Sequence, residues 1–199
     1  MRDRFTGRIL GAGTTSGVRV VVGRWDASPW GAFSDVMVAE PSGARILLAP
    51  DQRVADYVSA TYSFDEVRIG PVSVAGEAAW VISAPGLELR VRTGRREAVG
   101  WLLRAVPRHI ATSTAWARVT DPIARRVMRG VRTRGSAGNG RTETYGAYDL
   151  HGVVSLAGRW QDELLGDLAP VAPEPGFGFG STPEAPSVTS LVTTVVRPG

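Results

Sequence analysis

Apolar and polar residues alternate over several short stretches of this chain, and this period of two is typical of β-strands with one buried face. The clearest case is residues 87–93, where Leu87, Leu89 and Val91 are separated by charged residues. One face of this strand is therefore expected to be buried and the other solvated. The same criterion predicts further strands over residues 5–10, 18–25, 33–40, 44–49, 66–74, 78–84, 142–150, 153–156 and 187–196.

Two stretches have helical rather than strand spacing. Asp51 is a suitable N-cap, and Val54, Tyr57 and Val58 follow at spacings of three and four, which predicts a short helix near 51–61. Residues 98–106 are apolar with similar spacing, and the proline that follows must end or kink that helix.

A further short helix is expected over residues 123–129. Asp121 is a candidate N-cap, Pro122 occupies the first helical position, and Gly130 stands where a C-cap glycine is common. A glycine- and serine-rich stretch at 135–140 follows, and its composition predicts a loop.

Most of the predicted strands follow one another without a helix between them. This order favours a mainly β fold over alternating βαβ units. We expect a single domain over 1–199: a barrel-like antiparallel domain of about ten strands with a helical insertion near 97–130. An arginine-rich segment at 94–134 contains this insertion, and a Pro/Gly-rich segment at 169–186 precedes the last strand. The run of strands resembles lipocalin-type barrels and acetoacetate-decarboxylase-type β folds in architecture. The Schiff-base lysine of the decarboxylases has no counterpart in this chain.

The composition excludes several chemistries. All 23 basic residues are arginine, and the chain has no lysine and no cysteine. Schiff-base formation, tethered pyridoxal phosphate, a P-loop lysine and a thiol nucleophile are therefore excluded, and no cofactor is expected. No apolar run is long enough for a transmembrane helix or a signal peptide, so we expect a cytoplasmic protein.

Charge is strongly segregated along the chain. Residues 90–141 hold 13 arginines and two acids, a net charge of +11, whereas the rest has a net charge of −7. Apolar residues are interleaved with these arginines, which suggests binding of an amphiphilic anionic small molecule in a barrel cavity covered by the basic helical segment. The candidate ligand-binding residues are Trp101, Arg104, Arg108, Arg125 and Arg129.

Other interpretations remain open. The arginines can simply form a solvated face, or the segment can bind an anionic membrane surface. Nucleic acid is less favoured, because no helix-turn-helix, zinc or RNP signature is present. Whether the protein is an enzyme is undecided: Tyr145, Asp149 and His151 are the candidate catalytic group, since on a regular strand these three side chains would share one face.

Two further observations bear on a site. His109 and His151 are too isolated for any known metal-ligand spacing, so no metal is expected. Asp35 lies among apolar residues of a predicted strand, where an inward-facing carboxyl without an arginine partner would be a candidate functional group. Trp25 and Phe33 lie near it in sequence and are expected to pack in the core or line a barrel mouth.

Overall fold

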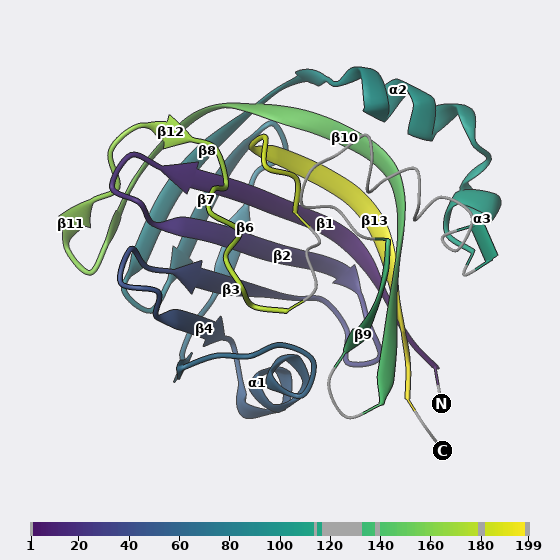
Figure 1. Ribbon diagram of the computed structural model, residues 1–199, viewed down its shortest axis with the longest axis horizontal. Helices are drawn as coiled ribbons and strands as arrows, with labels where there is room; N and C mark the ends of the chain where they lie inside the picture. Colours follow the sequence, from purple (N-terminus) through teal and green to yellow (C-terminus); the bar gives the residue numbers. More distant parts are fainter. Residues whose placement is uncertain (1, 114, 117–132, 138–139, 179–181, 198–199) are drawn as a thin grey trace.

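A computed structural model of the chain describes residues 2–113, 115–116, 133–137, 140–178 and 182–197. The fold is mainly β, as predicted, and is built on one strongly curved sheet (Figure 1). Ten strands follow one another across it in the order β5-β4-β3-β2-β1-β13-β10-β8-β7-β6, with β9, β11 and β12 attached at the sides.

The N-terminal half of the sheet comes from consecutive antiparallel strands. They are β1 (Arg2–Thr14), β2 (Arg19–Ala27), β3 (Phe33–Ala39) and β4 (Arg45–Ala49). The other strands are β5 (Glu66–Ile69), β6 (Ser73–Ala75), β7 (Ala79–Ala84), β8 (Leu87–Arg96), β9 (Arg134–Ala137), β10 (Arg141–Trp160), β11 (Glu163–Leu164), β12 (Leu168–Ala169) and β13 (Ser187–Val196). The helices are α1 (Gln52–Ser59), α2 (Ala98–Ala105) and α3 (Arg108–Ala111).

The sheet curls into a half-barrel because its concave face buries a large apolar core. Trp80 on β7 is fully buried in the same cluster as Leu10 and Val22, which lie on strands far from β7 in the sheet order. A second bridge across the curl is the Trp160 Nε1–H, which donates to Glu40 Oε1 over 2.7 Å. Burial on this scale is the main driving force for closing the sheet upon itself.

The opposite, convex face carries a second apolar layer. Even-numbered positions of β1 such as Leu10 belong to the concave core, whereas Ile9 packs with Val21 and Leu191 on the other side. Helix α1 and the turn that follows it cover part of this convex face, where Val54 packs against β4. A strand buried on both faces cannot show clean alternation, which explains the nearly continuous apolar run in β2.

Helix α1 forms where the sequence predicts it. Asp51 accepts a hydrogen bond from the Val54 amide at 2.9 Å, as an N-cap does. The helix connects β4 to β5, and these two strands pair in parallel. This pair is the exception to the antiparallel arrangement, because a helical crossover returns the chain in the same direction.

Several expected boundaries need correction. Residues 142–156 form no pair of strands but part of one long strand, β10. The expected loop at 135–140 begins with strand β9, which pairs with β10. The stretch 66–74 divides into β5 and β6 around Gly70 and Pro71. The helix expected at 123–129 lies outside the described residues.

Helices α2 and α3 follow β8 and lie on the far side of the molecule from α1 (Figure 1). Among the described residues, no helix has the length and apolar character needed to cross a membrane.

Candidate functional site

A partly open cavity of about 60 Å³ lies between α1 and the convex face of the sheet. Residues from β1, β2, β3, β10 and β13 form its floor, and residues of α1 and the following turn cover it. Six of its lining side chains are aromatic: Phe5, Trp25, Phe33, Tyr57, Tyr62 and Tyr145.

Two carboxyl groups face this mainly apolar cavity. Asp35 on β3 is 3% exposed and Glu143 on β10 is 5% exposed. No ion pair to either carboxyl occurs within the described residues, and the cavity lining contains no Arg or His. Buried carboxyls without a cation are costly, so they are uncommon away from functional sites.

Asp35 is held by one specific contact. The Trp25 Nε1–H donates to Asp35 Oδ1 over 2.9 Å, between neighbouring strands. Burial raises the pKa of Asp35 to about 6, and the hydrogen bond from Trp25 opposes this rise only in part. Gly23 makes the contact possible, because a Cβ there would stand 2.5 Å from Asp35 Oδ1 and 2.6 Å from Trp25 Nε1.

Glu143 is coupled to two tyrosines. The Tyr62 hydroxyl donates to Glu143 Oε2 over 3.0 Å, and the Tyr62 and Tyr145 hydroxyls are hydrogen-bonded to each other. The pKa of Glu143 is raised to about 7, mainly by burial; hydrogen bonds from Tyr62 and Tyr145 oppose the rise, and the negative charge of Asp35 adds to it. Burial also raises the pKa of Tyr62 well above its ordinary value, so Tyr62 stays protonated and remains a donor.

The aromatic wall of the cavity centres on Phe5. Its ring lies 5.7 Å from Trp25, 6.3 Å from Phe33 and 5.3 Å from Tyr57, measured between ring centroids. The Tyr57 hydroxyl donates to Asp3 Oδ2 over 3.0 Å, which fixes this ring at the edge of α1. These ring contacts are edge-on or tilted, the arrangements that aromatic pairs prefer.

The structure separates the three candidate catalytic residues. Tyr145 lies opposite Thr193 on β13 and lines the cavity, whereas Asp149 lies opposite Ser190. A bulge between Ala147 and Asp149 shifts the register, so the expectation of one shared face is wrong.

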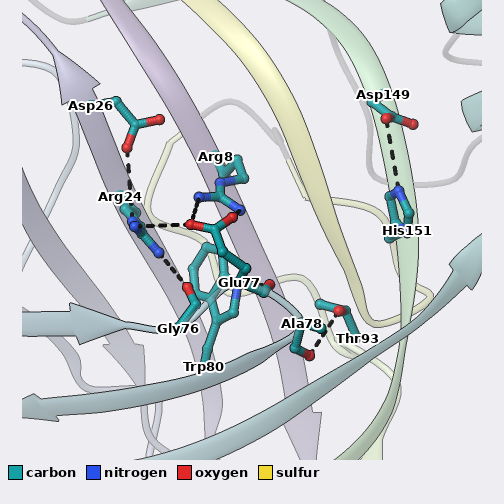
Figure 2. Close-up of polar contacts among 10 residues, drawn as sticks. All are labelled: Arg8, Arg24, Asp26, Gly76, Glu77, Ala78, Trp80, Thr93, Asp149 and His151. Carbon is teal, nitrogen blue, oxygen red and sulfur yellow. Dashed lines mark hydrogen bonds and ion pairs between the residues drawn. The ribbon is translucent and has the colours of Figure 1, made fainter.

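Asp149 and His151 do lie together, on the concave face. His151 Nε2 is 3.7 Å from Asp149 Oδ2 (Figure 2). Asp149 is held mainly by Arg96, which donates to both of its carboxylate oxygens at 2.7 and 3.0 Å. Partial burial opposes ionisation of Asp149, but the hydrogen bonds from Arg96 and the Leu150 amide outweigh it and lower its pKa.

Three of the five predicted anion-binding residues, Trp101, Arg104 and Arg108, lie on α2 and α3, away from this cavity. Trp101 is 61% exposed and stacks against the Arg96 guanidinium at 4.6 Å. Arg104 Nη1 is 3.6 Å from Asp149 Oδ2, and Arg108 donates to the Tyr148 hydroxyl at 2.7 Å. Arg125 and Arg129 lie outside the described residues.

Sequence reasoning singled out Asp35 and Tyr145 but missed Glu143 and Tyr62. The available signal for Glu143 was its position two residues before Tyr145 on a predicted strand, which places both side chains on one face. Tyr62 follows the helix in a turn, where no periodic pattern indicates direction. Within the described part of the chain, no group of His, Asp and Glu side chains could hold a metal ion.

Comparison with known proteins finds no matching family, no matching curated sequence and no matching solved structure.

Proposed function

We propose that the cavity beneath α1 binds a small, mainly apolar molecule that carries a protonated nitrogen. One observation carries this proposal: Asp35 and Glu143 face an aromatic cavity whose lining contains no cationic side chain. A bound ammonium group would supply the missing counter-charge.

The energetics favour a cation over an anion in this cavity. An anion would meet two carboxyls whose ionisation is already opposed by burial. A cation would lower both carboxyl pKa values by direct attraction, and it would also be attracted to the faces of the surrounding aromatic rings. The apolar remainder of the ligand would contact side chains such as Ile9 and Val21.

Binding of an ammonium group in this cavity should change the protonation of Glu143. Glu143 has a pKa of about 7 without a ligand, so a large fraction of the protein carries a proton there at neutral pH. An ammonium ligand selects the ionised carboxylate, so binding should release protons and become tighter as pH rises through about 6 to 7.

The test compares benzylamine with its neutral counterpart benzyl alcohol, using isothermal titration calorimetry at several pH values. We expect benzylamine to bind more tightly as pH rises, and we expect Glu143→Gln to weaken it by about tenfold or more. Benzyl alcohol should show neither effect. Glu163→Gln, which removes an exposed acid from β11, is the matched control and should bind benzylamine as the wild type does.

Equal binding of benzylamine by the wild type and Glu143→Gln would refute the cationic ligand. Preferred binding of benzyl alcohol, strengthened at low pH, would instead indicate that protonated carboxyls donate hydrogen bonds to a neutral molecule.

The earlier hypotheses from sequence stay predictions. Each of them needs its own experiment. They are an amphiphilic anion bound by Arg104 and Arg108, a lipocalin-like cavity, an enzyme using Tyr145, Asp149 and His151, membrane or nucleic-acid binding, and a cytoplasmic location. The hydrogen bond from Arg108 to the Tyr148 hydroxyl favours a structural role for Arg108.

A further inference from the structure

Two arginines lie side by side on the concave face of the sheet. Arg8 on β1 is the direct cross-strand partner of Arg24 on β2 (Figure 2). Like charges directly opposite each other in an antiparallel pair are destabilising, and an anion placed between the two arginines would relieve this repulsion.

Both guanidinium groups are held in place by packing. Each lies over the ring of Trp80, at 5.5 Å for Arg8 and 5.9 Å for Arg24, and Trp80 itself is fully buried. The two arginine side chains are only 20% and 22% exposed. Their donors are therefore fixed before any anion arrives, which lowers the entropic cost of binding one.

The main anion at this pair is the chain's own Glu77, and Asp26 Oδ1 also lies 3.8 Å from Arg24 Nε (Figure 2). Arg8 donates from Nη1 to Oε2 at 2.6 Å and from Nη2 to Oε1 at 3.1 Å, in the two-pronged geometry that arginine adopts with carboxylates. Arg24 Nη2 donates to the same Oε1 at 3.3 Å. The arrangement is thus already shaped around one carboxylate group.

The Glu77 backbone is anchored, because its carbonyl accepts from the buried Trp80 indole at 3.0 Å, whereas its carboxylate is held by the two arginines. Glu77 follows Gly76, which has a φ of +88°, in the turn between the edge strand β6 and β7. The Glu77 side chain is 73% exposed, far more than either arginine. An exposed side chain on a turn at the sheet edge can leave its partners without disturbing the buried core.

We propose that Arg8 and Arg24 form a binding site for the carboxylate of a small molecule, and that Glu77 occupies this site until the ligand displaces it. The site lies on the opposite face of the sheet from the cavity beneath α1 and takes the opposite charge, so it is independent of the proposed function. Asp149 lies in the same cross-strand row, two strands beyond Arg8, and its charge is paired with Arg96.

A purely structural role makes a different prediction. Arg24 also donates from Nη1 to the Gly76 carbonyl at 2.5 Å, so the cluster joins the β6–β7 turn to β2. If this link were its only purpose, removing the Glu77 charge would lower stability and create no affinity for carboxylates.

The experiment titrates hexanoate into the full-length protein, followed by calorimetry and by the arginine Nε–Hε resonances. We expect Glu77→Gln to bind hexanoate about tenfold more tightly than the wild type, since the competing carboxylate is gone. Adding Arg8→Gln to that variant should abolish the gain. Glu163→Gln matches the change in net charge and should leave hexanoate binding at the wild-type level.

Glu77→Asp is the second test, because it keeps the negative charge but shortens the side chain and loses the two-pronged contact. It should also bind hexanoate more tightly than the wild type, and it covers the case in which Glu77→Gln does not fold. If neither variant gains affinity over Glu163→Gln, the proposal is wrong. Glu143→Gln should not alter hexanoate binding, so failure here and failure of the cavity proposal are distinguishable.

Discussion

Tyr62 donates a hydrogen bond to the buried carboxyl of Glu143 over 3.0 Å, although the two residues are 81 positions apart in the chain. Tyr62 comes from the turn after α1 and Glu143 from β10, so the contact exists only once the helix has packed on the sheet. It also fixes the Glu143 carboxyl at the cavity wall. A buried carboxyl of this kind makes the stability of the fold depend on whether the carboxyl is protonated.

Stability should therefore fall as pH rises from about 4 to about 7. Burial raises the pKa of Glu143 to about 7 and that of Asp35 to about 6, against about 4 for both types in unfolded chains. The folded state holds protons that the unfolded state has lost, so this stabilisation is full below pH 4 and disappears above pH 7. Each group contributes roughly 3 to 4 kcal/mol at most.

Urea unfolding between about pH 5 and pH 8 measures this effect. Glu143→Gln should reduce the decline by about half, because one of the two groups no longer titrates. Glu163→Gln changes an exposed acid and should retain the wild-type slope. A free energy of unfolding that is constant or increasing over this range would contradict the assignment of raised pKa values.

Gly23→Ala should break the contact between Trp25 and Asp35. A Cβ at this position would stand 2.5 Å from Asp35 Oδ1, so the carboxyl or the indole must move. A buried donor or acceptor left without its partner costs about 1–3 kcal/mol, and this is the expected loss in the free energy of unfolding.

A double-mutant cycle with Trp25→Phe isolates this cause. Trp25→Phe removes the indole N–H, so Gly23→Ala should cost less in that background than in the wild type. Full additivity of the two losses would show that Gly23 acts through something other than this hydrogen bond.

Sequence periodicity predicted the sheet because each strand needs only a local pattern. The strand over 87–93 and the cap at Asp51 are determined by neighbours in sequence, and both are confirmed. Asp35 could be flagged for a related reason, since a charged residue inside an apolar strand conflicts with its local context.

The cavity itself could not be predicted in this way. Glu143 lies in a stretch of β10 that is buried on both faces, so its spacing from Tyr145 predicts a shared face but not which face borders a cavity. Its partner Tyr62 lies in the turn after α1 and contacts Glu143 only through tertiary packing. The bulge before Asp149 adds one residue to the strand and puts Asp149 and His151 on the opposite face from Tyr145, which a rule of strict alternation cannot anticipate.

That bulge places Asp149 against Arg96, and the pair should be measurable. Asp149→Asn keeps the shape but loses the charge that accepts two hydrogen bonds from Arg96, at an expected cost of about 1–3 kcal/mol at neutral pH. Because the folded pKa of Asp149 is lowered, its stabilisation is present above about pH 4 and is lost as pH falls further. The difference between wild type and variant should therefore shrink in acid.

Arg104→Gln serves as the comparison, because Arg104 is 57% exposed and its Nη1 is 3.6 Å from the same carboxylate. An exposed pair at that separation contributes about 0–1 kcal/mol, so this variant should unfold nearly as the wild type does. Urea unfolding at about pH 7 and about pH 3 gives the loss in the free energy of unfolding for each of the two variants at each pH. An equal cost of Asp149→Asn at both pH values would mean that the side chain stabilises the protein by its shape and not by its charge.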